Sequence, residues 1–407
     1  MSVGTRRGRG AARRESRPSL LTRTFLVVAA AELAYFTADG VLIPALPRYV
    51  ESQLGGGNVA VGLVAGAFSF TAFFLRPWAG LQADRRGRRL LMIVGASVFA
   101  VSVAGYLVAT SVPVLIAMRL LTGAGEALFF VGAVSANLDL APPERRGEAM
   151  SFASLALYLG IGIGPLIGEA LIEHVGFRAV WIASIVLAAV AVAFALRLPS
   201  MTPDRTDDLP GRHRLVHRAG LLPGVVLLMA ILGMAGFLAF VPLYALDIGL
   251  SGSGLVLGLF SGIVVLIRSV GARIPDRLGA SRTTRISLAL SAVGLAVIGT
   301  WREPAGLVLG AAILGVGVAL FTPALFALAA NSVEANERGA VMGTTSAFLD
   351  LAFGLGPAIL GFVAVAVGRG GTFLAGAAVA VVGLVLVTTT KLGRTPSRRV
   401  PAEGAEA

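Results

Sequence analysis

The sequence predicts an all-α membrane protein whose twelve transmembrane helices form two pseudo-symmetric six-helix bundles. Three observations predict this fold class. The 407 residues are 56% hydrophobic and only 14% charged, with a mean hydropathy of +0.85, whereas about a quarter of the residues in soluble domains are charged. Many apolar runs are about 20 residues long, the length of a helix that crosses the hydrocarbon of a bilayer. The second half of the chain repeats motifs of the first half.

The chain divides into two bundles that are flanked and joined by charged segments. We expect a basic cytoplasmic tail, a first bundle, a cytoplasmic linker, a second bundle and a second cytoplasmic tail, at 1–23, 24–197, 198–220, 221–391 and 392–407. The spans of the first bundle are predicted at 24–47, 60–80, 89–109, 113–138, 148–171 and 177–197. Those of the second bundle are predicted at 221–245, 254–274, 284–301, 304–330, 339–367 and 371–391. Prolines and charges exclude a span from the linker.

Neither the tails nor the linker indicate a metal site or a cofactor. The chain has no cysteine, and therefore neither disulfides nor thiolate ligands. His213 and His217 stand four residues apart and could pair on a metal, but no acidic ligand accompanies them in that register. This favours a solvated linker. The Arg-rich residues 1–23 lack the apolar core of a signal peptide and are expected to orient the chain on anionic lipid.

The positive charges follow the positive-inside rule. If both termini are cytoplasmic, all but seven of the 34 Lys and Arg residues fall on the cytoplasmic side. The exceptions are Arg48, Arg178, Arg302 and Arg369 outside, and Arg76, Arg119 and Arg268 within spans. This distribution explains the net charge of +12 without a nucleic-acid partner. It predicts a multi-pass protein of the inner (cytoplasmic) cell membrane with both termini in the cytoplasm.

An internal repeat relates the two halves. The offset is 192 residues, from Asp84 to Asp276. The same offset carries Arg76 to Arg268, Gly123 to Gly315, Gly125 to Gly317, Met150 to Met342, and Gly164-Pro165 to Gly356-Pro357. A series of this length without a gap indicates two homologous bundles in parallel orientation, related by a pseudo-twofold axis along the membrane normal.

Three motifs resemble signatures of the major facilitator superfamily. Gly80–Arg89, with Gly80, Asp84, Arg85, Gly87 and Arg88, is similar to the loop signature between the second and third helices of that family. Arg119–Ala127 resembles its fourth-helix signature. Gly160–Glu169 resembles the fifth-helix signature of its proton-coupled exporters, except that Glu169 replaces the last glycine. The resemblance implies a transporter that moves small solutes by rocking two bundles about a central site.

The residues of these motifs also have direct physical interpretations. Gly87 permits a tight reversal of the chain, and Asp84 can cap the helix that follows. Arg85 or Arg88 could pair with Asp139 as a lock that holds one conformation; a solvated loop is the alternative. In the fifth span, Gly160, Gly164 and Gly168 form one small face for close helix packing, while Pro165 allows a bend.

Ionisable residues within the spans are functional candidates, because charge is unfavourable in hydrocarbon. Glu32 and Asp39 lie seven residues apart on one face of the first span, and either could bind a proton or a cationic group. Arg119 and Glu126 lie seven apart on the fourth span. Arg119 could assist proton transfer, as the family resemblance implies, or form a buried ion pair with Glu126 or Asp39. Asp350 lies about 18 Å into the eleventh span, at 1.5 Å per residue.

Other charged residues receive structural interpretations. We expect Arg76 and Arg268 to snorkel or to form pairs that stabilise a bundle. Glu169, Glu173 and His174 are expected to be hydrated rim residues at the outer end of the fifth span. Few Asn, Gln and Trp residues but many aromatic residues in the spans favour an apolar cavity.

These patterns predict a proton-coupled exporter of drugs or lipophilic small metabolites that works by alternating access. Its expected partners are a small-molecule substrate, protons and the lipid bilayer, and the protein is expected to be a monomer. Uptake of a sugar, organic acid or other nutrient is the alternative within transport. A membrane enzyme would need a clustered His/Asp/Glu site, which the sequence does not contain, and an intact gating loop argues against a sensor or scaffold.

Overall fold

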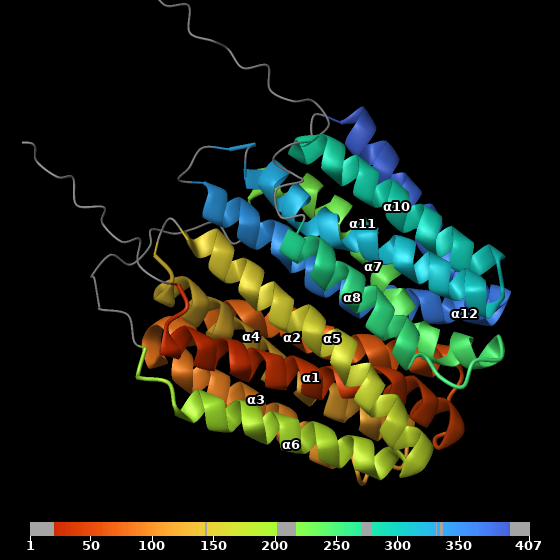
Figure 1. The fold of residues 1–407 in the computed structure, drawn as a ribbon, viewed down its shortest axis with the longest axis horizontal. Coiled ribbons are helices and arrows are strands. Elements are labelled where there is room, and N and C mark those ends of the chain that lie inside the picture. Colours follow the sequence, from red (N-terminus) through yellow and green to blue (C-terminus); the bar gives the residue numbers. More distant parts are fainter. Residues whose placement is uncertain are drawn as a thin grey trace, which may run out of the picture.

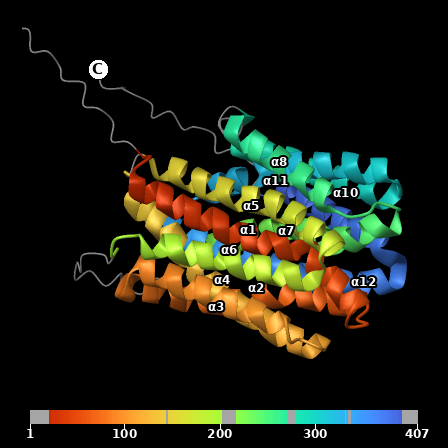
Figure 2. The same ribbon diagram turned by 60° about the horizontal axis from the view of Figure 1, so that its bottom comes forward.

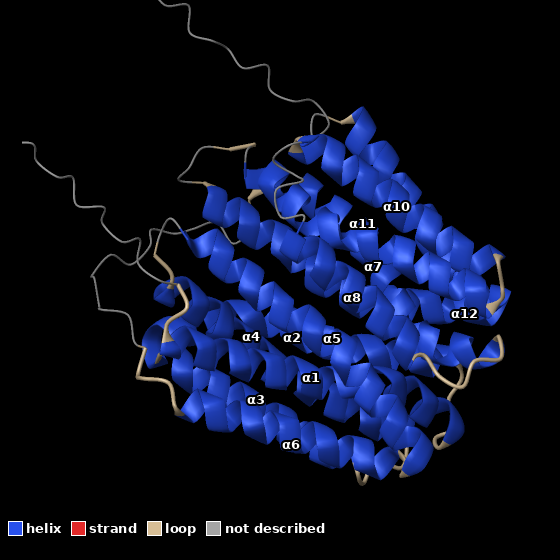
Figure 3. Cartoon of the chain, viewed as in Figure 1, coloured by secondary structure: helices blue, strands red, loops and turns tan. Residues whose placement is uncertain are grey.

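The computed structural model describes residues 20–142, 145–201, 217–270, 278–330, 332–333 and 337–390. These residues form helices joined by short turns, with no strand among them (Figure 3). The helices are α1 (Arg23–Ser52), α2 (Asn58–Arg86), α3 (Arg88–Tyr106), α4 (Val112–Leu140), α5 (Arg146–His174), α6 (Phe177–Leu196), α7 (Arg218–Asp247), α8 (Gly254–Val270), α10 (Ala280–Thr300), α11 (Pro304–Ala330) and α12 (Arg338–Thr389).

These helices account for the twelve predicted spans. Ten of the described helices are long and apolar enough to cross a bilayer, and α8 is a shorter apolar helix. The last two spans both lie in α12, where Gly368 leaves the helical conformation with φ 73° and ψ 172°. Only glycine adopts such a conformation readily, and it marks the turn between the two spans. Asp276 and Arg277 of the second repeat, most of the predicted linker and nearly all of both predicted tails lie outside the described residues.

The helices form two bundles that lie side by side (Figures 1 and 2). In the first bundle, α1 packs against α5 and α6, while α4 packs against α2 and α3. In the second bundle, α7 and α10 pack against α12, while α11 packs against α10 and α8. The bundles meet mainly where α2 contacts α12 and where α5 contacts α8. These two seams determine which side chains of one bundle can reach the other.

Two predicted element ends are wrong. The first span was predicted to end at residue 47, but α1 continues through Pro44 and Pro47 to Ser52. A proline removes one backbone donor, and packing against neighbouring helices compensates for this loss inside a membrane protein. The predicted loop after residue 80 is also largely helical, because α2 runs to Arg86 and α3 begins at Arg88. Gly87 alone makes the reversal, with φ 90°.

The two bundles share two ends, which we call the tail face and the opposite face. The tail face is where α1 begins at Arg23 and α2 ends at Arg86. The opposite face is where α1 ends at Ser52 and α2 begins at Asn58.

Candidate functional site

Three charged side chains meet inside the molecule, at the seam between α2 and α12. Arg76 of α2 donates a hydrogen bond from Nη2 to Glu126 Oε1 of α4 at 2.9 Å. The same Nη2 lies 3.0 Å from Asp350 Oδ1 of α12. The Arg76 guanidinium also lies 4.5 Å from the centre of the Phe130 ring. Because α12 belongs to the second bundle, Arg76 joins the two bundles by charge.

Some hydrogen-bonding atoms of these three side chains have no partner among the described residues. Asp350 is only 5% exposed, and Arg76 Nε and Glu126 Oε2 are buried without a hydrogen-bond partner among the described residues. One guanidinium therefore faces two carboxylates, which leaves a negative charge uncompensated if all three groups are ionised. From the sequence we assigned Arg76 to snorkelling or to a bundle-stabilising pair, and we missed that it links Glu126 to Asp350.

Among the described residues, Arg119 makes neither of the ion pairs that the sequence left open, with Glu126 or with Asp39. It is 4% exposed and donates from Nε to the Val64 carbonyl at 3.1 Å, and its guanidinium lies 4.6 Å from the Phe68 ring centre. Among the described residues, no carboxylate oxygen lies within 4.0 Å of it. Arg119 and Glu126 are seven residues apart, about 10 Å along one helix. That rise keeps the two groups from touching directly.

Asp39 is the carboxylate without a partner. Within the described residues it makes no hydrogen bond and no ion pair, although it interacts electrostatically with Arg119 and Glu126. It is only partly buried. Among the described residues, three carboxylates, Asp39, Glu126 and Asp350, thus interact electrostatically with two guanidinium groups, Arg76 and Arg119.

Glu32 occupies a separate buried position between α1 and α4. It is 2% exposed, and its Oε1 accepts a hydrogen bond from Asn137 Nδ2 at 2.8 Å. Glu32 Oε2 and Asn137 Oδ1 are buried acceptors without a partner among the described residues. Asn137 was not singled out from the sequence. An uncharged residue gave no signal there, although an amide within a predicted span is a polar group that needs a partner.

At the tail face, Arg88 takes part in the predicted pair with Asp139. Arg88 Nε donates to Asp139 Oδ2 at 2.9 Å, and Arg88 Nη1 lies 2.9 Å from Asp84 Oδ1. Arg85 is exposed, so Arg88 is the partner of Asp139. Asp84 does not cap α3 as we expected, because α3 has no side-chain cap. Instead, Asp84 at the end of α2 neutralises Arg88 one turn later.

The glycine face of α5 packs on α1 within the first bundle. A Cβ atom added to Gly160 would lie 2.5 Å from the Phe36 carbonyl carbon, and one added to Gly164 would lie 2.5 Å from that of Gly40. A Cβ on Gly168 would lie 2.5 Å from the Val41 carbonyl oxygen. Pro165 lies inside the uninterrupted α5. These residues therefore set the closeness of two helices and touch no charged group.

At the opposite face, two charged residues connect the bundles. Arg369, which follows the turn in α12, pairs with Glu51 of the first bundle, donates to Asn58 Oδ1 at 3.0 Å and donates to Asp247 Oδ1 at 2.8 Å. Sequence analysis had placed this arginine in an outer loop without a role.

Glu169 is the second connecting residue, and the expectation of a hydrated rim residue is wrong. It pairs with Arg48 and accepts hydrogen bonds from Ser253 N at 2.7 Å and Ser253 Oγ at 2.9 Å. Ser253 lies just before α8, so these bonds join α5 to the start of α8 and leave the Glu169 side chain 14% exposed.

The chain is similar in sequence to known membrane transporters. A family model described as Major Facilitator Superfamily matches residues 28–301 and 253–407. An uncharacterized MFS-type transporter of Salmonella typhimurium is 30% identical over 375 residues, which are 89% of this chain and 95% of the relative. The uncharacterized MFS-type transporter YhhS of Escherichia coli is 26% identical over 90% of this chain and 92% of its own.

Two solved structures have similar folds. The human organic anion transporter MFSD10 matches with a TM-score of 0.71 and 21% identity, over 91% of this chain and 100% of that one. The nucleoside transporter NupG matches with a TM-score of 0.74 and 14% identity, over 90% of this chain and 98% of that one.

Proposed function

The chain belongs to the major facilitator superfamily, and from this premise we propose that it exports drugs or lipophilic small metabolites in exchange for protons. It is a multi-pass membrane protein of a transporter family, with a small-molecule substrate and the lipid bilayer as its partners. To this we add three proposals: the direction of transport, its coupling to protons and the chemistry of the substrate.

The unequal number of buried charges is the observation that carries proton coupling. Among the described residues, Asp39, Glu126 and Asp350 interact with the guanidinium groups of Arg76 and Arg119, while the buried Glu32 pairs with the neutral Asn137. Ionised together, the first three carboxylates would leave one excess negative charge where water is scarce, and an uncompensated charge is unfavourable there. One bound proton, or one cationic group of a substrate, restores neutrality. Competition between the two for the same carboxylates would couple their movements.

Alternating access follows from where the bundles are joined. In the described residues, hydrogen bonds and ion pairs between the bundles occur at the opposite face, through Arg369 and Glu169, and at Arg76–Asp350. We place the tail face in the cytoplasm, as the positive-inside rule favours. This conformation is then closed toward the outside. A proton on Asp350 would weaken its attraction to Arg76 and so favour separation of α2 from α12.

Two features favour export of lipophilic compounds. The fifth-helix motif resembles that of proton-coupled exporters, and its Gly160, Gly164 and Gly168 allow α5 to lie directly against α1. An aromatic ring adjoins the interior charges, since Phe130 lies beside Arg76. Aromatic surroundings favour apolar and amphiphilic groups over sugars.

The Asp39→Asn variant tests the proposal. It removes the excess charge without breaking an ion pair, so we expect a folded protein that has lost proton-linked transport. Cells that overexpress the chain are first screened on a drug panel with and without an uncoupler. The variant is then compared with wild type in proteoliposomes that carry a pH-sensitive dye. Glu173→Gln, an exposed carboxylate on α5, is the control and should transport normally.

Three results separate the alternatives. Uncoupler-sensitive resistance that Asp39→Asn abolishes supports proton-coupled export. Higher accumulation of a compound in overexpressing cells indicates uptake instead. Drug accumulation that is the same in wild type and in Asp39→Asn contradicts a proton-binding role for the interior carboxylates.

A further inference from the structure

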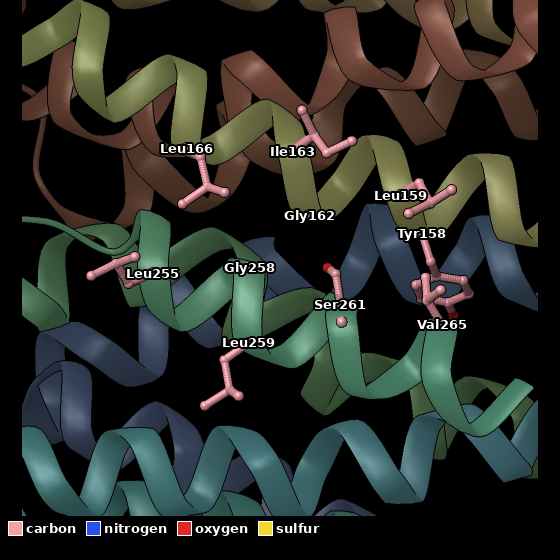
Figure 4. Close-up of a pocket in the computed structure, with 11 residues that line it drawn as sticks. Tyr158, Leu159, Gly162, Ile163, Leu166, Leu255, Gly258, Leu259, Ser261 and Val265 are labelled. Atoms are coloured by element: carbon pink, nitrogen blue, oxygen red, sulfur yellow. The ribbon is translucent and has the colours of Figure 1, made fainter.

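A groove runs along the outside of the seam between α5 and α8, away from the buried charges. It has a volume of about 300 Å³. Figure 4 shows that residues from both helices line it, among them Leu159, Leu166 and Leu255. Leu255 is 82% exposed and Leu166 is 41% exposed. Side chains exposed on a membrane-spanning helix face hydrocarbon, so this groove opens to the bilayer.

Glycines give the groove its depth. A Cβ on Gly162 would lie 2.9 Å from Ser261 Cβ, so any larger residue there would fill the space between the helices. Gly258 and Gly262 line the α8 side. A Cβ on Gly262 would meet no atom within 4 Å. The groove is therefore open at Gly262 and can be filled there without a clash.

A buried hydroxyl on the groove wall lacks a partner. Ser261 is 1% exposed, and its Oγ makes no hydrogen bond with any described residue. Serine hydroxyls within helices usually bond to the carbonyl one turn earlier, as Ser269 does to Val265 at 2.8 Å. Ser261 instead lies in the groove, where Figure 4 shows it between α8 and Gly162 of α5. An unpaired hydroxyl away from water is unfavourable, and this one is enclosed where α8 packs against Gly162, beneath the open part of the groove at Gly262.

A positive charge adjoins the end of the groove nearer the tail face. Arg268 lies two turns beyond Ser261 on α8, about 10 Å along the helix axis. Its guanidinium carbon is 4.7 Å from the ring centre of Tyr158, which lines the groove. Arg268 Nε is buried without a hydrogen-bond partner among the described residues. The groove thus has an apolar wall, and a cation adjoins one of its ends through Tyr158.

We propose that this groove binds an anionic single-chain amphiphile from the bilayer. The acyl chain lies against the leucines of α5 and α8. The anionic head group meets Arg268, and the acyl chain passes Ser261 and Gly262 along the groove. This site is separate from the interior carboxylates and does not rest on the proposed transport function.

The test measures binding to the full-length protein in detergent micelles. The probe is palmitate with a photoactivatable diazirine in its chain, and the matched neutral probe is the corresponding alcohol. After irradiation, peptide mass spectrometry locates the label. We expect it on residues 158–166 and 255–265, with the anionic probe labelling about tenfold more than the alcohol.

Two variants test separately the binding of the acyl chain and the binding of the anionic head group. Gly262→Leu fills the groove and should reduce labelling about tenfold, equivalent to roughly two buried methylene groups. Gly343→Leu is the matched control, because Gly343 is also an exposed helical glycine with no atom within 4 Å of an added Cβ. It should label as wild type does. Arg268→Gln should make the two probes label equally.

Three outcomes would overturn the proposal. The first is label spread over all lipid-facing helices in proportion to their exposure. The second is labelling unchanged by Gly262→Leu. The third is equal labelling of the wild type by the anionic and the neutral probe. Because binding is the readout, loss of transport in Asp39→Asn neither supports nor weakens this site.

Discussion

At the scale of single residues, the hydrogen bonds around Glu32 indicate that this carboxyl group carries a proton. The Glu32–Asn137 pair has one hydrogen bond, of 2.8 Å, and two buried acceptors without a donor. Unpaired acceptors in a dry interior are unfavourable. A proton on Glu32 would supply the donor that the pair lacks, as in a carboxylic acid that faces a primary amide.

The Glu32→Gln substitution tests this interpretation. A glutamine amide has both a donor and an acceptor, so it can satisfy Asn137 as a protonated glutamate would. We expect the melting temperature of the purified protein to stay at or above that of wild type. Glu32→Ala should be less stable by about 1–3 kcal/mol, because it leaves the buried Asn137 amide unpaired. If Gln and Ala destabilise equally, the pair requires a charged carboxylate.

Sequence reasoning identified most of the interior charges but not their partners. A charge inside an apolar run is visible from composition, which is why Glu32, Asp39, Arg119, Glu126 and Asp350 could all be predicted. Partner choice depends on how helices approach one another, and α2 meets α12 only after both bundles have formed. The internal repeat also applies to these contacts. Arg76 and Arg268 occupy equivalent positions, and each contacts the other bundle, at Asp350 and Tyr158.

At the scale of elements, the close contact between α1 and α5 depends on glycines, which have no side chain. The α5 glycines lie so close to α1 that backbone touches backbone, and Gly40 on α1 faces Gly160 and Gly164 in return. Small residues allow this approach between membrane helices, where packing rather than water exclusion drives association.

Gly164→Ala measures the strength of this contact. The new Cβ would lie 2.5–2.6 Å from Gly40 and Val41 backbone atoms, so α1 and α5 must move apart. We expect a loss of about 1–3 kcal/mol in stability, the usual effect of overpacking, seen as a lower melting temperature. Gly147→Ala in the same helix meets nothing within 4 Å and should change little. Equal melting temperatures for the two variants would mean that α5 is free to shift.

Element types were more predictable than element ends. Long apolar runs identify spans directly, whereas the end of a helix depends on local caps and on neighbours. Pro44 and Pro47 did not end α1, since surrounding helices hold the chain in place beyond them. Gly87 did end α2, because its positive φ cannot continue a helix. Proline and glycine both disfavour helices. Whether a helix ends at such a residue therefore depends on its backbone conformation and on the helices packed around it.

At the scale of the whole molecule, the bundle-to-bundle hydrogen bonds of the described residues gather toward one face. In the described residues, Arg369 and Glu169 make their bundle-to-bundle hydrogen bonds at the opposite face, while the Arg88–Asp139 pair at the tail face stays within the first bundle. Rocking that opens the opposite face must therefore break these contacts.

A pair of cysteines across α5 and α8 tests whether this opening is required. The chain has no cysteine, so introduced thiols pair only with each other. A Cβ on Gly254 would lie 3.4 Å from Glu169 Cβ, close to the usual separation in a disulfide. We expect the Glu169→Cys, Gly254→Cys double variant to crosslink on oxidation, to stop transport and to recover when reduced.

The control places a disulfide inside one bundle. A Cβ on Gly105 would lie 3.9 Å from Met118 Cβ, so the Gly105→Cys, Met118→Cys pair joins α3 to α4 without crossing the seam. Rigid-body rocking leaves that distance unchanged, and transport should survive oxidation. If the bundle-to-bundle crosslink forms completely and transport continues at the wild-type rate, the bundles do not separate at this face. Substrate would then have to leave by another route, and the alternating-access proposal would be wrong for this protein.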